Sequence, residues 1–199
     1  QGDRVCKKGV YFDTGEIKLE FKPYRPQIPI YLGVKGPKAL KMAAQIGDGV
    51  LMSIMTSVPY VKYVRDEISK AIPDETKKDI KLAAYLAISI SEDREQARNA
   101  VKPMLAKYFG IHGVHKILTC TKMAEEDILR FKEAMLRNED ATSLVNDWMI
   151  DTFAVAGTPE ECRSKIKELV DAGLDHPVAF EIPGIPMEET MKQVARYLM

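Results

Sequence analysis

A glycine-containing turn between an apolar run and a helix pattern is the segment of this sequence best suited to binding chemistry. Gly33-Val34-Lys35-Gly36-Pro37 follows the apolar run Ile30-Tyr31-Leu32. Where a strand passes into a helix, free backbone amides and the helix dipole attract an anion, and glycines let a ligand approach the backbone closely. The turn therefore suits a coenzyme phosphate. A Gly-x-x-Gly turn is also a common tight connection, so the motif alone leaves both interpretations open.

Polar side chains near the predicted strand ends form a second group of candidates. Ser53 follows the next strand and offers its hydroxyl to a phosphate or coenzyme side chain, or else to the local backbone. Lys35 and Lys38 are able to neutralise a phosphate, although lysines at a helix start are also common on solvated surfaces. Glu181 and the turn Pro183-Gly184 either line a substrate mouth or simply end the last strand.

Metal and disulfide chemistry are not indicated. His112 and His115 are three residues apart and would make a pair of metal ligands on one helical turn. No carboxylate motif accompanies them and Gly113 weakens a helix between them, so we interpret both as solvated loop histidines. The three cysteines form no Cys-x-x-Cys pair, which argues against a disulfide framework or zinc site and fits a reducing compartment. They are Cys6, Cys120 and Cys162.

The composition is that of a globular protein. Of 199 residues, 46% are apolar and 29% charged, which provides for one ordinary domain with a core. The 29 basic and 29 acidic residues balance, so we expect small-molecule ligands and neither nucleic-acid nor membrane partners. No apolar run approaches the roughly 18 residues of a membrane span and no signal peptide is recognisable, so we expect a cytoplasmic location. Because the chain begins with Gln1, we expect it to be a fragment.

The first residues predict a surface hairpin. Two short runs within Val5–Phe21 adjoin turn-formers at Lys8-Gly9 and Asp13-Thr14-Gly15. Ile17–Phe21 alternates like a strand with one solvated face. We assign residues 1–27 to a hairpin and lead-in within a single domain spanning residues 1–199.

Downstream, apolar segments that suit strands alternate with helix patterns. Pro37 suits a first helical position and Gly47 a C′ position, and Ser57 with Pro59 opens a second helix that Pro73-Asp74 ends. The four predicted strands are Ile30–Leu32, Val50–Met52, Ile80–Ile90 and Val178–Ile182.

Two further helical regions complete the pattern. Residues 93–151 predict a helical insertion in three pieces, with breaks near Gly110–Gly113 and Asn138–Asp140. Thr158-Pro159-Glu160-Glu161 has the pattern of a capping box and opens a helix that ends at Gly173.

This order predicts an α/β fold with parallel strands, arranged as a doubly wound sheet or a barrel. A complete (β/α)₈ TIM barrel needs roughly 250 residues, and four β-α units with an insertion make about half of one. An isolated four-stranded parallel sheet would also expose two apolar edges. We therefore predict the C-terminal half of a TIM barrel, with the N-terminal half absent.

Several segments resemble the bacterial luciferase-like superfamily. Within it, the chain is most similar to coenzyme F420-dependent methylenetetrahydromethanopterin reductases and related F420-dependent oxidoreductases. The resemblance covers most of the chain apart from the helical insertion. Its segments are Ile28–Leu40, Ile46–Leu51, Ala156–Glu161 and Asp171–His176.

The resemblance implies hydride transfer between a deazaflavin and a small substrate, with F420 as coenzyme, and we expect a homo-oligomeric assembly. It assigns cofactor binding to the strand-end residues and leaves the catalytic residues unknown, because the family's ring-facing residues come from the first half of the barrel. An FMN-dependent luciferase-like monooxygenase and a non-catalytic half-barrel that pairs with another chain are the alternatives. We expect the isolated chain to self-associate and to lack reductase activity. The candidate cofactor-binding residues are Gly33, Val34, Lys35, Gly36, Pro37 and Ser53.

Overall fold

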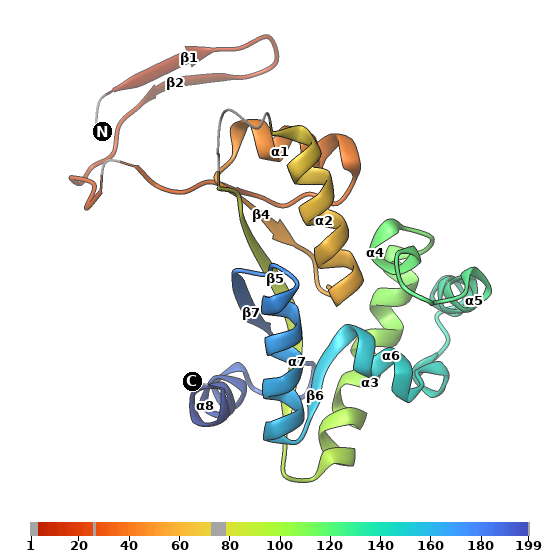
Figure 1. The fold of residues 1–199 in the computed structure, drawn as a ribbon. Coiled ribbons are helices and arrows are strands. Elements are labelled where there is room, and N and C mark those ends of the chain that lie inside the picture. Colours follow the sequence, from red (N-terminus) through yellow and green to blue (C-terminus); the bar gives the residue numbers. More distant parts are fainter. Residues whose placement is uncertain (1–3, 26, 73–78, 199) are drawn as a thin grey trace. The chain divides into compact units, whose positions relative to one another are not determined.

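The structure is a computed structural model, and it describes residues 4–25, 27–72 and 79–198. The chain divides into two compact units, residues 1–30 and residues 31–199 (Figure 1). The site and the parallel sheet belong to the second unit.

The first unit contains an antiparallel hairpin of β1 (Val5–Lys8) and β2 (Asp13–Ile17). The tight turn lies at Gly9, whose amide donates to the Phe12 carbonyl at 2.7 Å. The prediction was wrong about Asp13-Thr14-Gly15, which lies inside β2, and about Ile17–Phe21, which leaves the strand after Ile17. The physical reason is a β-bulge. The register between β1 and β2 shifts by one residue between Cys6 and Lys8, and Gly15 takes a φ of 59°.

The second unit is built on a parallel sheet whose strands are ordered β3-β4-β5-β6, with β7 also paired to β5. The pairings of β5 define its two edges. Ala83 and Ala84 pair with both β4 and β7, so these two strands lie at opposite edges of β5. Ala87 pairs with both β6 and β7, so β6 lies at the same edge as β4, farther along β5. The strands are β3 (Tyr31–Leu32), β4 (Gly49–Met52), β5 (Lys81–Ile90), β6 (Ala154–Gly157) and β7 (His176–Phe180).

The four predicted strands are therefore adjacent and parallel in the order β3-β4-β5-β7, while a fifth strand, β6, was missed. The sequence of β6 is only Ala-Val-Ala-Gly, and its strand conformation depends on pairing with residues 87–90 of β5. The last strand ends at Phe180 and not at Ile182. The parallel α/β sheet is confirmed, but the count of strands is corrected to five.

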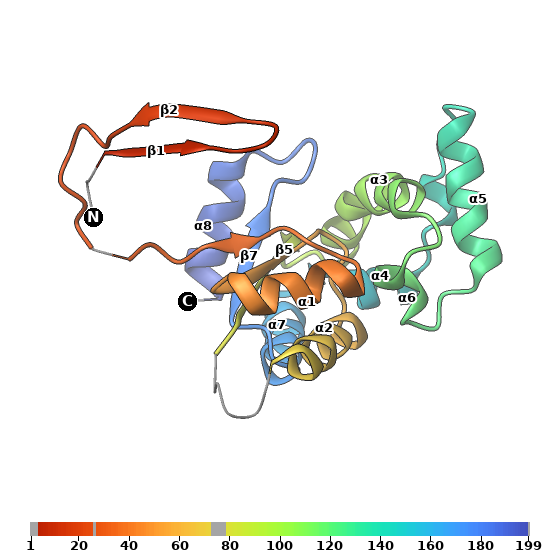
Figure 2. The same cartoon turned by 90° about the horizontal axis from the view of Figure 1, so that it is seen from above.

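Helices α1, α2 and α7 lie together along the strands (Figure 2). Ser57 caps α2 by accepting from the Tyr60 amide, and the predicted capping box of α7 is present, with Thr158 and Glu161 each accepting from the other's amide. Gly47 was expected at the C′ position but is the C-cap residue of α1, with an extended backbone and φ −96°. Pro73-Asp74 lies outside the described residues. The helices are α1 (Pro37–Ile46), α2 (Val58–Ala71) and α7 (Pro159–Asp171).

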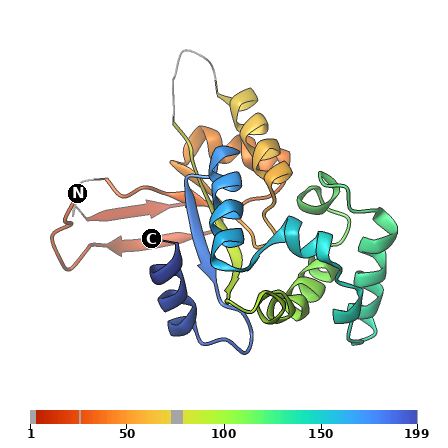
Figure 3. The ribbon, with the colours of Figure 1, turned by 60° about the horizontal axis from the view of Figure 1, so that its bottom comes forward.

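The predicted helical insertion forms a lobe beside the sheet, drawn from green to cyan in Figure 3. Its breaks fall near the expected positions: Gly113 follows the last residue of α3 with φ 56°, and Asn138 takes φ 57° after α5. A short helix and a 3₁₀ turn were not predicted. The lobe contains α3 (Arg94–His112), α4 (Lys116–Thr119), α5 (Glu125–Leu136), a 3₁₀ turn (Thr142–Leu144) and α6 (Asp147–Phe153). The final helix is α8 (Met187–Tyr197).

The large side chains on the two faces of the sheet differ in burial. Val50, Met52 and Leu82 point to one face and are fully buried, which is the pattern of strands covered by helices. The alternate positions Tyr31 and Tyr85 are only half-buried. No helix in the described part of the chain is long and apolar enough to cross a membrane.

Candidate functional site

The turn between β3 and α1 is the predicted Gly33–Pro37 segment. Gly36 is the residue before the helix, with an extended backbone, and Pro37 is its first residue. The first helical hydrogen bond runs from the Leu40 amide to the Gly36 carbonyl, at 2.9 Å. No side chain caps α1, so the amides of Lys38 and Ala39 are available to a ligand. The helix start thus has the donors that the sequence predicted for an anion.

The two glycines of this turn leave the backbone open. A Cβ placed at Gly33 or Gly36 would meet no heavy atom within 4 Å. Gly49 is different, because a Cβ there would lie 2.5 Å from the Tyr31 ring. Gly49 is therefore required by tight contact inside the unit, whereas Gly33 and Gly36 are not. Their small size keeps accessible space beside the backbone.

The neighbouring loop follows β4 and begins with Ser53. Leu32 pairs with Val50 in parallel register, so the loops after β3 and β4 both lie at the carboxyl end of the sheet. The Thr56 hydroxyl donates to the Ser53 carbonyl at 2.8 Å, and Met55 is buried with φ 77°, a strained conformation for a side chain of this size. The half-buried Ser53 hydroxyl makes no hydrogen bond within the described residues. It is thus available to a ligand.

Tyr60 on α2 connects the two loops. Its hydroxyl donates to the Lys35 carbonyl at 3.4 Å. Burial, with contributions from Tyr63 and Cys120, raises the pKa of Tyr60 above its ordinary value. The hydroxyl therefore stays protonated near pH 7 and donates to the backbone of the β3–α1 turn.

His112, the last residue of α3, contacts the side chain of Lys35. The Lys35 Nζ lies 3.4 Å from the His112 Nδ1. Burial, followed by the charge of Lys35, lowers the pKa of His112 to about 4. The imidazole is therefore neutral near pH 7 and accepts a hydrogen bond from the ammonium.

The prediction that both insertion histidines are solvated was wrong. His112 is half-buried and its Nε2 is inaccessible to solvent, while His115 caps α4 by accepting from the Ile117 amide at 3.2 Å. The sequence reasoning also missed Tyr60. A histidine in the last turn of a helix is a weak local signal, and its partner Lys35 lies 77 positions earlier. No group of three or more metal-ligating side chains occurs among the described residues.

Residues 1–176 match the family model described as luciferase-like monooxygenase. The chain belongs to this family. The resemblance seen in the sequence is thereby confirmed.

Named relatives of this luciferase-like chain are reductases and dehydrogenases. It is 28% identical to the 5,10-methylenetetrahydromethanopterin reductase of Archaeoglobus fulgidus, over 100% of this chain and 61% of the relative. It is 26% identical to an F420-dependent glucose-6-phosphate dehydrogenase of Amycolatopsis mediterranei, over 96% of this chain and 54% of the relative. The chain thus spans less than two thirds of the length of these relatives.

A solved structure of a reductase is also similar to this chain in fold. The coenzyme F420-dependent tetrahydromethanopterin reductase of Methanopyrus kandleri superposes with a TM-score of 0.79 at 28% identity. The alignment covers 96% of this chain and 56% of that one.

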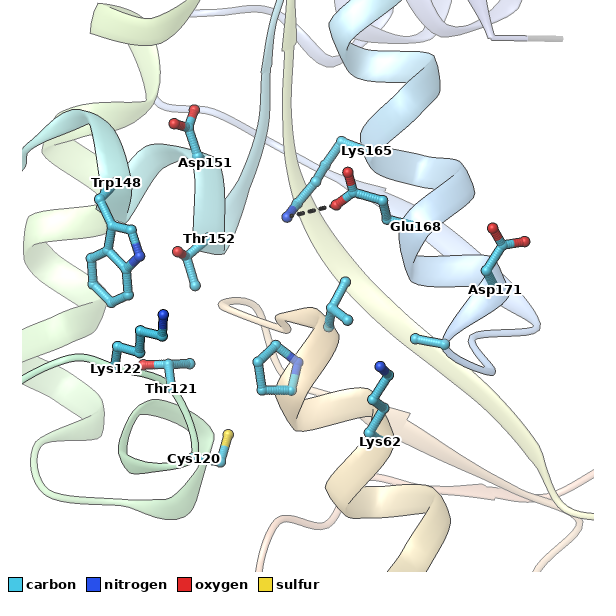
Figure 4. Close-up of a pocket in the computed structure, with 13 residues that line it drawn as sticks. Lys62, Cys120, Thr121, Lys122, Trp148, Asp151, Thr152, Lys165, Glu168 and Asp171 are labelled. Atoms are coloured by element: carbon cyan, nitrogen blue, oxygen red, sulfur yellow. Dashed lines mark ion pairs between the residues drawn. The ribbon is translucent and has the colours of Figure 1, made fainter.

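A separate groove of about 730 Å³ lies between α2, α6 and α7 of the luciferase-like unit (Figure 4). Lys62, Lys122, Trp148 and Thr152 line it, together with the ion pair of Lys165 and Glu168. None of the predicted cofactor-binding residues lines this groove. The remaining candidate, Glu181, is exposed, and Gly184 forms a turn with φ 91°.

Proposed function

We propose that the protein containing this chain is a coenzyme F420-dependent oxidoreductase. It transfers a hydride between the deazaflavin and a small substrate, in the manner of methylenetetrahydromethanopterin reductase. Reductases of that name match the whole of this chain, and a dehydrogenase named as F420-dependent matches nearly all of it. Within this function, the chain provides the binding site for the phosphate of the coenzyme.

The open backbone of Gly33 and Gly36 at the start of α1 is the observation that carries this assignment. Phosphate oxygens accept hydrogen bonds from free amides at a helix start, and they require close approach to the backbone. Lys35 adds a positive charge to the same turn, and the Ser53 hydroxyl adds a donor from the neighbouring loop. These residue types fit a phosphate.

The bound deazaflavin supplies the hydride chemistry at its C5 carbon. The residues of this chain bind and orient the coenzyme through its phosphate, which fixes the reacting ring relative to the substrate. Tyr60 holds the turn through the Lys35 carbonyl. We assign no catalytic residue within this chain.

FMN also carries a phosphate, and the family model is named for monooxygenases, so FMN is the alternative coenzyme. The discriminating experiment titrates the intact protein with F420 and, separately, with FMN, and follows the fluorescence of each. We expect F420 to bind at least about tenfold more tightly, a difference of about 1.4 kcal/mol. Reduced F420 should also be oxidised when a methylene-pterin substrate is added. Tighter binding of FMN, or no binding of either, would refute the F420 assignment.

A further inference from the structure

The contact between Lys35 and His112 joins two distant parts of the second unit. Lys35 belongs to the β3–α1 turn, and His112 ends α3 in the helical lobe, 77 positions later. Lys35 forms no salt bridge with a carboxylate in the described part of the chain. The Lys35 ammonium is therefore oriented by a neutral acceptor and is not neutralised by a carboxylate.

The surroundings of His112 fix its ring in place. The Tyr108 ring, one helical turn earlier, lies 6.1 Å from the imidazole and meets Phe180 of β7 edge-on at 6.3 Å. Phe180 in turn meets Tyr85 of β5 at 5.4 Å. This row of aromatic rings connects the half-buried sheet face to His112, so the ring rests on a rigid support.

The charges near His112 keep it an acceptor. Burial disfavours its protonation most, and the charges of Lys35 and His115 act in the same direction. The backbone carbonyl of Ile54, in the loop after β4, acts in the opposite direction but is outweighed. The buried Nε2 has no hydrogen-bonding partner among the described residues. Nδ1 is thus the nitrogen that interacts with the ammonium.

We propose that His112 is a positioning residue for the coenzyme site, which holds the Lys35 ammonium in the orientation that binds the coenzyme phosphate. This inference rests on the proposed function. A lysine side chain is flexible, and orienting it before the ligand arrives reduces the entropy lost on binding. A neutral imidazole achieves this without competing for the ammonium, as a carboxylate would. The helical lobe thereby contributes to coenzyme affinity through a residue that does not touch the coenzyme.

A double-mutant cycle on the intact protein tests this inference. The variants are His112→Phe, which keeps the ring volume, Lys35→Met, and both together, and the readout is the dissociation constant for F420. We expect His112→Phe to weaken binding about fivefold and Lys35→Met about tenfold, within the range for the net contribution of one hydrogen bond. The double variant should bind no more weakly than Lys35→Met alone, because the histidine acts through the lysine. Effects that simply multiply would overturn the inference.

Two comparisons separate positioning from a general structural effect. A deazaflavin riboside that lacks the phosphate should bind wild type and His112→Phe equally. His115→Asn changes a neighbouring histidine that accepts from the Ile117 amide and forms no hydrogen bond with Lys35 among the described residues, and it should leave the F420 affinity unchanged. If His112→Phe weakens the binding of the riboside and of F420 by the same factor, the positioning role is refuted.

The position of the acceptor atom gives a test that does not require the phenylalanine variant to fold. His112→Asn places an acceptor oxygen near the site of Nδ1, and His112→Gln places it one bond farther. We expect Asn to retain F420 affinity within about twofold and Gln to lose about fivefold. Equal affinities would contradict the inference. Wild-type protein that fails to bind F420 at all would instead refute the proposed function.

Discussion

Arg65 on α2 and Asp175, just before β7, form an ion pair at the end of the sheet opposite the β3–α1 turn. The same guanidinium donates to the carbonyls of Gly173, at 2.8 Å, and Ile80, at 2.7 Å. The Asp175 carboxylate accepts from the Leu82 amide at 2.7 Å. These bonds join α2 to the beginnings of β5 and β7, so one arginine holds three elements in register.

Replacing Arg65 should therefore destabilise the fold. We expect Arg65→Ala to lower the free energy of unfolding by about 2–3 kcal/mol, because two carbonyls and a carboxylate lose their partner in a partly buried place. Urea denaturation of wild type and variant measures the change. Lys70→Ala, which removes an exposed lysine that pairs with Asp66 and Glu67, is the control and should have a much smaller effect than Arg65→Ala. Equal effects of the two substitutions would contradict this interpretation.

Two glycines of the second unit, Gly36 and Gly49, should respond differently to substitution by alanine. Gly36→Ala should leave the melting temperature nearly unchanged, because a Cβ there meets open space, yet weaken F420 binding about tenfold by blocking the phosphate. Gly49→Ala should lower the free energy of unfolding by about 1–3 kcal/mol, because the new methyl meets Tyr31. Thermal melts and coenzyme titrations on both variants make the comparison. A Gly36→Ala protein that binds F420 normally would argue against contact between that turn and the phosphate.

The lowered pKa of His112 predicts a pH-dependent stability. Between the ordinary value of 6.5 and the folded value of about 4, the unfolded state takes up a proton that the folded state excludes. Unfolding is therefore favoured as the pH falls through this window, and the loss levels off below pH 4. Relative to His112→Asn, which does not titrate, wild type should lose on the order of 1 kcal/mol, discounted for partial exposure. Urea denaturation at pH 7, 5.5 and 4 tests this, and a constant difference would disprove it.

The capping box of α7 predicts a modest local effect. Thr158→Ala removes the hydroxyl that accepts from the Glu161 amide, and it should lower the free energy of unfolding by about 1 kcal/mol. Thr158→Ser keeps the acceptor and should restore most of the stability. Chemical denaturation of wild type and the two variants measures these free energies of unfolding. If serine and alanine were equally destabilising, the methyl group and not the cap would be responsible.

The elements predicted correctly from sequence are those with local signals. Pro37, Ser57 and Thr158 mark helix starts through their own backbone preferences or caps, and the structure places all three as expected. The strand β6 carries no such signal, because its four small residues become a strand only by pairing with the far end of β5. In the hairpin, the bulge at Gly15 replaced the expected turn, since the actual turn is closed at Gly9.

The same distinction applies to the site. The turn Gly33–Pro37 was recognisable because a glycine pattern between a strand and a helix has a local physical meaning. His112 and Tyr60 were not, because both contact Lys35, which lies far away in the sequence. Side chains that act through tertiary contacts have no spacing rule from which they can be inferred.

The most direct test of the proposed site is a crystal structure of the intact protein with F420 bound. The proposal predicts the coenzyme phosphate within hydrogen-bonding distance of the backbone amides at the start of α1, with the Lys35 ammonium beside it and still in contact with His112. A phosphate bound elsewhere, such as in the groove between α2, α6 and α7 near Lys62 and Lys122, would contradict the proposal.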